Sequence, residues 1–168
     1  MHTTATNALS AWVVIASDLA ESATAEASGL PERALAALVF VSNRPACGID
    51  WLYRRLGVTQ SGAVRLVDRL EDHGLLIRER TAGRREVALR LTAAGEACLS
   101  HGLRARAASL ETLVAPLSPD EQTQLVKLIA KSLAHGRRRR DQADVACRLC
   151  EWDACTPDCP VDESVVPD

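Results

Sequence analysis

Four cysteines lie close together near the end of this 168-residue chain, and thiols at such spacing can bind a metal. Cys147, Cys150, Cys155 and Cys159 follow the pattern C-x2-C-x4-C-x3-C. In a reducing compartment this clustering favours a metal over disulfides. We expect one zinc ion held by four thiolates, which would fold an otherwise marginal segment. An iron–sulfur cluster is the alternative, favoured by the compact spacing and by Pro160 after the last cysteine. A redox disulfide is a third interpretation.

Short polar residues at the start of an expected helix over residues 59–73 form a second chemical pattern. Thr59 is a suitable N-cap, and arginines follow further along the same helix. A helix that is polar at its exposed N-terminal end and apolar behind can enter the major groove of DNA, where its side chains meet base edges and phosphates. The pattern predicts these DNA-binding residues: Thr59, Gln60, Ser61, Arg65 and Arg69.

Arg84 and Arg85 form a basic pair beyond this helix. Residues 81–83 are turn material, and partial alternation on either side predicts a two-stranded ribbon over residues 75–79 and 86–91. A basic hairpin beside a reading helix is the wing of a winged helix-turn-helix, and the narrow, negative minor groove favours arginine. We therefore predict that both arginines bind DNA, with Arg84 as the minor-groove contact.

Apolar spacing outlines the elements that must position these side chains. In the reading helix, Val64, Val67 and Leu70 are expected to face the core. Ser118 and Glu121 form a capping box at the start of the last long helix. Four other helices are expected. The first covers residues 7–26, the second begins at Pro31, the third carries Ile49, Leu52 and Leu56 on one face, and the fourth is capped by Thr92. The predicted fold class is mainly α with a small β-hairpin wing: a winged helix-turn-helix with N- and C-terminal dimerisation helices.

The charge is divided unevenly along the chain. Residues 141–168 hold eight acidic residues and one basic residue, a net charge of −7, whereas residues 1–140 carry +5. Exposed charges are screened beyond about 8 Å at physiological salt, so a phosphate backbone responds to the local field. The total charge of −2 therefore does not exclude a nucleic-acid partner. We expect a DNA-binding and dimerisation domain over residues 1–136, and an Arg-rich linker with a cysteine-rich, acidic tail over residues 137–168.

Several classes of protein are disfavoured by what the sequence lacks. The N-terminus has no basic segment leading into an apolar core and a cleavage site, and no apolar run approaches the length of a membrane span. There is no Gly-rich phosphate loop, and no nucleophile and base stand at a spacing that indicates a catalytic motif. We therefore expect a cytoplasmic protein that is neither a membrane protein nor an enzyme.

The sequence resembles the MarR family of bacterial transcription regulators over roughly residues 7–135. The resemblance rests on residues 56–61, 64–71, 74–76, 84–85 and 91–95. It implies a homodimer whose first and last helices interlock, with two reading helices on a pseudo-palindrome in double-stranded DNA. The apolar stripes of residues 9–23 and 125–133 suit that interlocking. The resemblance also implies a small-molecule effector pocket between the dimer helices and the DNA-binding lobe.

The wing departs from the family pattern at one position. Gly83 stands where an aspartate usually precedes the arginine pair, so the carboxylate that commonly orients the wing arginine is missing.

Together these patterns predict a dimeric repressor that reads a pseudo-palindromic operator and is released by a small-molecule, redox or metal signal. One alternative is a metal- or redox-sensing switch whose primary sensor is the cysteine tail. Another is an iron–sulfur electron-transfer protein or enzyme subunit with an incidental helical body. The tail itself fits either a sensor or a structural clip.

Overall fold

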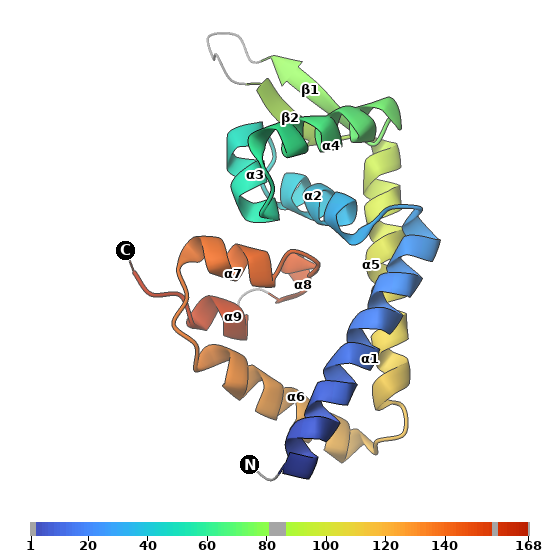
Figure 1. The fold of residues 1–168 in the computed structure, drawn as a ribbon, viewed down its shortest axis with the longest axis vertical. Coiled ribbons are helices and arrows are strands. Elements are labelled where there is room, and N and C mark those ends of the chain that lie inside the picture. The colour runs from blue at the N-terminus through green and yellow to red at the C-terminus, as the bar shows by residue number, and fades with distance from the viewer. Residues whose placement is uncertain (1–2, 81–86, 156–157, 168) are drawn as a thin grey trace.

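The computed structural model describes residues 3–80, 87–155 and 158–167 of the chain (Figure 1). Helices make up most of this structure, and a two-stranded antiparallel sheet completes it. The expected fold class, mainly α with a small β-hairpin, is confirmed. None of the described helices combines the length and the apolar character needed to cross a bilayer. The described elements are α1 (Thr3–Ser28), α2 (Glu32–Asn43), α3 (Ile49–Leu56), α4 (Gln60–Asp72), β1 (Leu76–Arg80), β2 (Val87–Leu91), α5 (Ala93–Val114), α6 (Pro119–Ala134), α7 (Arg140–Ala146), α8 (Trp152–Cys155) and α9 (Pro160–Glu163).

A head at one end of the molecule is formed by α2, α3, α4 and the β1–β2 hairpin (Figure 1). Helix α2 is its centre, and all of its residues from 34 to 41 are buried. Leu52 of α3, Val67 of α4 and Leu89 of β2 are fully buried in the same core. Gly57 adopts left-handed backbone, with a φ of 62°, in the tight turn from α3 to α4. Apolar burial on the inner faces thus holds α3 and α4 together as a helix-turn-helix.

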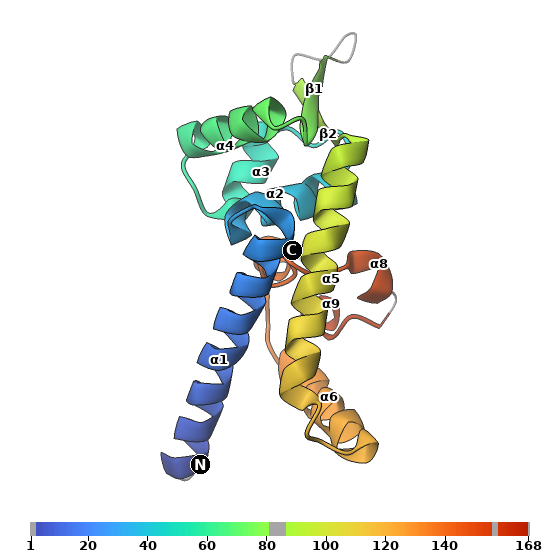
Figure 2. The same ribbon diagram turned by 90° about the vertical axis from the view of Figure 1, so that its right-hand side faces the viewer.

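Two long helices, α1 and α5, pack side by side and extend away from the head (Figures 1 and 2). Thr92 caps α5, its Oγ1 accepting a hydrogen bond from the Gly95 N–H at 3.0 Å. Gly95 lies where α5 meets the start of the hairpin, because a Cβ there would come within 1.9 Å of the Leu75 carbonyl oxygen. Helix α1 buries only small residues, among them Ala16 and Ala20. Its larger apolar side chains are left on the surface.

Helix α6 returns from the far end of α5 towards the middle of the molecule (Figure 1). It begins with the expected capping box, in which the Glu121 carboxylate accepts from the Ser118 N–H at 2.8 Å. Helix α6 is described throughout and has no buried residue. On its apolar side Val126, Leu128 and Ile129 are exposed to solvent.

The chain after α6 folds against the head as a small unit, here called the C-terminal module (residues 137–167). Its helices α7, α8 and α9 lie between α6 and the α2–α3 part of the head (Figure 1). Its buried residues are few, and most are small or polar: Ala143, Asp144, Leu149, Val161 and Ser164. Sequence periodicity indicated no helices here, because segments of four to seven residues are too short to show it.

Candidate nucleic-acid interface and thiol cluster

Helix α4 turns a polar side to the solvent and an apolar side to the core. At its start the Thr59 Oγ1 accepts a hydrogen bond from the Gly62 N–H at 3.1 Å, which confirms Thr59 as the N-cap. The opposite side of α4 is buried through Ala63, Leu66, Val67 and Leu70. The structure thus gathers the residues that the sequence indicated on this helix, all of them exposed: Thr59, Gln60, Ser61, Arg65 and Arg69.

Helix α3 contributes to this face by fixing one of these side chains. The Gln60 Nε2 donates a hydrogen bond to the Asp50 Oδ1 at 2.8 Å, across the turn of the helix-turn-helix. The Thr59 and Ser61 hydroxyls lie 3.3 Å apart at the same end of α4. Two polar pairs, Thr59–Ser61 and Gln60–Asp50, therefore lie at the N-terminal end of the helix, where backbone N–H groups and the helix dipole favour phosphate.

The position of Val64 differs from the expectation that it faces the core. Its side chain is 37% exposed, whereas Leu66 is buried. The buried stripe of α4 follows positions 63, 66, 67 and 70, the i, i+3, i+4, i+7 pattern, and position 64 falls beside it. Val64 shares the exposed side with Ser61 and Arg65. An apolar side chain in that place can contact a thymine methyl group.

The base of the wing is tied to α4 by Arg78 of β1, a residue that the sequence analysis did not single out. Its guanidinium pairs with Asp68 at 2.6 Å and also with Glu71. The Glu71 Oε1 further accepts from the Arg78 backbone N–H at 3.2 Å. The two carboxylates are three residues apart on α4, a spacing that places them on one side of a helix. The wing arginines Arg84 and Arg85 lie outside the described residues, so their DNA contacts stay a prediction.

A surface cavity of about 710 Å³ lies beside α4. It reaches from the start of α2 to the exposed side of α4, and its lining joins cationic to apolar groups. Arg33, Arg65 and Arg69 supply the positive charge, and Val58 and Leu66 supply apolar surface. The one carboxylate among the described lining residues, that of Asp68, is paired with Arg78. This combination suits a small ligand with an aromatic or aliphatic body and an acidic group.

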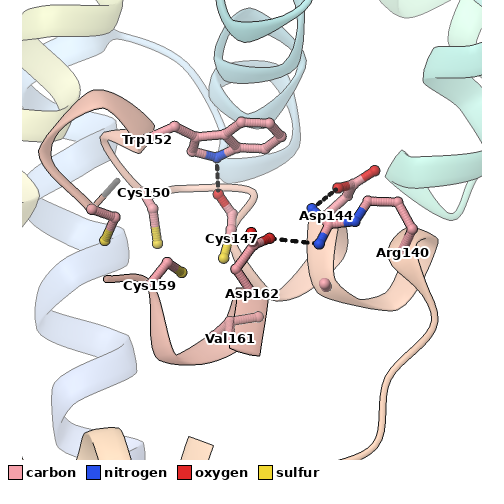
Figure 3. Close-up of a pocket in the computed structure, with 10 residues that line it drawn as sticks. Arg140, Asp144, Cys147, Cys150, Trp152, Cys159, Val161 and Asp162 are labelled. Carbon is pink, nitrogen blue, oxygen red and sulfur yellow. Dashed lines mark hydrogen bonds and ion pairs between the residues drawn. The ribbon is translucent and has the colours of Figure 1, made fainter. Parts of the chain in front are cut away.

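The four cysteines of the C-terminal module line a single cavity of about 210 Å³. Figure 3 shows the sulfur atoms of Cys147, Cys150 and Cys159 turned towards a common space next to Trp152. Cys155 lines the same cavity. Within the described ranges, no three His, Cys, Asp or Glu side chains are already gathered as ligands of one ion. The thiols therefore share a cavity whose donors suit zinc or an iron–sulfur cluster, and a single ion would have to draw them inward.

The thiols of this cavity differ in how readily they ionise. The Cys147 thiol stabilises the Cys150 thiolate by a hydrogen bond and lowers the pKa of Cys150 to about 7, with help from Arg106 and Arg148. The same hydrogen bond raises the pKa of Cys147. Cys47 behaves differently, because burial raises its pKa to about 11. Burial also raises the pKa of Cys155, so the lowered pKa in this cavity is that of Cys150.

Comparison with known proteins agrees with this architecture. Residues 28–85 match the model of the MarR family. The solved structure of RV1404 from Mycobacterium tuberculosis is similar to this chain with a TM-score of 0.69 and 26% sequence identity. The match covers 82% of this chain and 97% of that one. No curated protein matches.

Two further solved structures are similar at lower identity and support the fold. The transcriptional repressor CouR, bound to a 23-mer DNA duplex, has a TM-score of 0.57 and 24% identity over 74% of this chain and 88% of its own. The MarR family protein RV2887 of Mycobacterium tuberculosis, in complex with salicylic acid, has a TM-score of 0.56 and 22% identity over 71% and 87%. The helix-turn-helix segment of this chain thus matches the model of the MarR family, and its overall fold is shared with these solved structures.

Proposed function

We propose that this chain is a dimeric repressor that reads a pseudo-palindromic operator in double-stranded DNA with α4 and the wing. The observation that carries the proposal is the side of α4 that holds Thr59, Gln60, Ser61, Arg65 and Arg69 in solvent over a buried apolar back. The net charge of +5 on residues 1–140 attracts the phosphate backbone. CouR, a repressor with the same fold, was solved on DNA. Such a protein acts in the cytoplasm, where bacterial DNA is.

The surface of α1 and α6 supports the dimer. Large apolar side chains are exposed along both helices, and a solvent-facing apolar patch of this kind marks a protein interface. A second copy related by a two-fold axis would cover both patches at once and would place two copies of α4 on successive half-sites. The exposed residues are Leu9, Trp12, Val13, Val14, Ile15 and Leu19 on α1, and Val126, Leu128 and Ile129 on α6.

The cavity beside α4 supports a small acidic molecule as one releasing signal. Arg65 and Arg69 line this cavity and also belong to the proposed DNA-reading face. A ligand that pairs with these arginines therefore competes with phosphate for the same charges. RV2887 was solved with salicylic acid, a molecule of this chemical class. Salicylate is accordingly the first probe for release.

Selection from a random duplex library, followed by fluorescence anisotropy at several salt concentrations, tests the DNA-reading face. Replacing Arg65, Arg69 or Arg84 by Ala should weaken binding by about 1–3 kcal/mol where the side chain reads a base, or lower the salt slope by about 1 where it contacts a phosphate. Arg104→Ala, at an exposed arginine of α5, is the matched control and should change neither. Unchanged affinity and salt slope in all three variants would contradict the proposal.

Sedimentation velocity tests the dimer. The wild-type chain should sediment as a dimer, and Leu128→Asp on α6 should yield a monomer, because it buries a charge at the interface. Lys127→Asp, one position away, is a control for the added charge. A wild-type chain that stays monomeric at micromolar concentration would contradict the dimer.

A further inference from the structure

The C-terminal module bridges the two parts of the molecule that operator binding must coordinate. It lies between the α2–α3 part of the head and α6, which carries part of the proposed dimer surface (Figure 1). A two-fold dimer binds half-sites about 34–36 Å apart, so the orientation of each head relative to the dimer helices decides whether both copies of α4 fit. A unit that contacts both parts can set that orientation.

On the head side, the main polar contact is a mostly buried ion pair. The Arg55 Nε of α3 donates to the Asp144 Oδ2 of α7 at 2.7 Å, and these side chains are 13% and 6% exposed. The Arg55 guanidinium also lies over the Trp51 ring, 3.9 Å from its centroid. Helix α3 leads directly into the reading helix. Separation of the module from α3 would leave a buried charge without its partner.

A second contact links the thiol cluster itself to the core of the head. The Trp152 indole Nε1 donates to the Cys147 carbonyl oxygen at 2.8 Å, as Figure 3 shows. The ring of Trp152 packs edge-on against Phe40, with centroids 6.4 Å apart. Phe40 in turn packs edge-on against Trp51 of α3 at 5.7 Å. A chain of contacts thus runs from the backbone of a cysteine to the helix that precedes α4.

On the other side, Arg138 attaches the module to α6. Its Nη1 donates to the Leu133 carbonyl oxygen at 2.7 Å and to the Ser164 Oγ at 2.8 Å. Its backbone N–H donates to the Ser164 carbonyl oxygen at 2.9 Å, and the Val166 N–H donates to the Arg138 carbonyl oxygen at 3.0 Å. The end of α6 and the last residues of the module are therefore held by one arginine.

The cysteines are placed where they would fasten the module's helices to one another. Cys147 is the C-cap of α7, Cys155 ends α8, and Cys159 is the N-cap of α9. Cys150 lies in the turn between α7 and α8. The buried core of the module is too small to hold three short helices firmly, whereas four metal–sulfur bonds would join all of them.

We propose that the four thiols hold one thiolate-ligated metal centre, a zinc ion or an iron–sulfur cluster, whose occupancy sets operator affinity by fixing the module between α3 and α6. The inference rests on the proposed DNA-reading function. Binding of a zinc ion, or transfer of a preassembled iron–sulfur cluster, replaces thiol protons, which pass to solvent, and requires no net oxidation or reduction. The loaded module holds one orientation of the head. Loss of the metal lets the head sample others, and the DNA-competent fraction falls.

Metal content is measured first, on the full chain purified under anaerobic conditions. We expect either one zinc per chain or iron with sulfide and visible absorption, and each result assigns the centre. Cys150→Ser with Cys159→Ser should abolish the metal. Cys98→Ser is the matched control, because this thiol lies outside the module and donates to the Ser28 carbonyl oxygen, so the variant should keep its metal. A metal-free wild-type chain, or a double variant that keeps its metal, would overturn the proposal.

Coupling is measured on the same protein, loaded and chelator-treated, with the selected duplex. We expect operator affinity to fall about 5- to 150-fold on metal removal, the usual range of coupling between sites. Asp144→Asn should retain the metal and lose most of this difference, because it weakens the contact to Arg55. Asp141→Asn is the matched control on the exposed side of α7, where the carboxylate pairs with Arg139, and it should preserve the affinity difference between the loaded and stripped forms. Equal affinity of the loaded and stripped forms would overturn the coupling while leaving DNA reading intact.

Hydrogen exchange gives a readout that does not depend on DNA. Metal removal should speed amide exchange in α3 as well as in α7, because the Arg55–Asp144 pair joins the two helices. If metal removal speeds amide exchange in α3 but neither the loaded nor the stripped form binds DNA, the proposed function is rejected, whereas the coupling between the metal centre and the head is supported. If amide exchange in α3 does not change on metal removal, the coupling between the metal centre and α3 is rejected.

Discussion

The head and the C-terminal module are held together by different forces. In the head, α2 is buried along most of its length and is surrounded by fully buried Leu52, Leu76 and Leu89. The module contributes Leu149 and the partly buried Trp152 to that core, and it adds ion pairs, Arg140–Asp162 at 2.5 Å within the module and Arg148–Glu32 at 2.8 Å to α2. Apolar burial makes a unit stable by itself, whereas paired charges specify a position and contribute less stability. The difference suits a rigid DNA-reading head joined to a C-terminal module whose position can change.

The largest expected effect comes from the same truncation made in each region. Leu38→Ala in α2, where the side chain is fully buried, should lower the free energy of unfolding by about 4–5 kcal/mol, and Leu149→Ala in the module by about 2–3 kcal/mol. Urea unfolding at fixed protein concentration measures both, since a dimer's stability depends on concentration. Equal losses at the two positions would break the comparison.

Two glycine substitutions, at Gly95 and Gly136, test how rigid the surroundings of each glycine are, with a smaller expected change in the free energy of unfolding. A Cβ at Gly95 would meet the Leu75 carbonyl oxygen, so Gly95→Ala should destabilise the chain by about 1–3 kcal/mol. A Cβ at Gly136 would meet the guanidinium of Arg138, which can move, although it then loses its bond to Leu133. Thermal unfolding should show Gly136→Ala to be the milder change. A reversed order would mean that the surroundings of Arg138, where the module begins, are more rigid than the contact between α5 and the hairpin.

The smallest effect concerns the capping box of α6, the helix next to the module. Hydrogen bonds from the Ser118 backbone and hydroxyl lower the pKa of Glu121 below its usual 4.5. Because the folded pKa is depressed, this contribution is present above the unfolded pKa and is lost as the pH falls through the folded one. Ser118→Ala should return the pKa of Glu121 towards 4.5 in an NMR titration and cost about 1 kcal/mol. Thr123→Ala, on the same helix, is the control that should leave this pKa unchanged.

Sequence patterns predicted the head better than the module, for physical reasons. Helices α1 to α6 are long enough to show apolar periodicity, and Thr59 and Ser118 are capping residues whose local geometry follows from their type. The placement of Val64 was wrong, because two candidate stripes one residue apart look alike on a short helix. The ion pair between Arg55 and Asp144 joins residues 89 positions apart, and no local pattern can reveal such a pair. The grouping of the four thiols was visible in the spacing, but their attachment to α3 was not.

The three tryptophans of the chain are distributed one to each region: Trp12 on α1, Trp51 in the head and Trp152 in the module. Each therefore reports on a different event by its fluorescence. Emission from Trp12, 39% exposed in the single chain, should shift to the blue when a second copy covers α1. Trp152 bonds to the backbone of a thiol ligand candidate, so its intensity should follow the filling of the neighbouring cavity. Variants that keep one indole at a time would let assembly, head movement and the state of the thiols be followed separately in one cuvette.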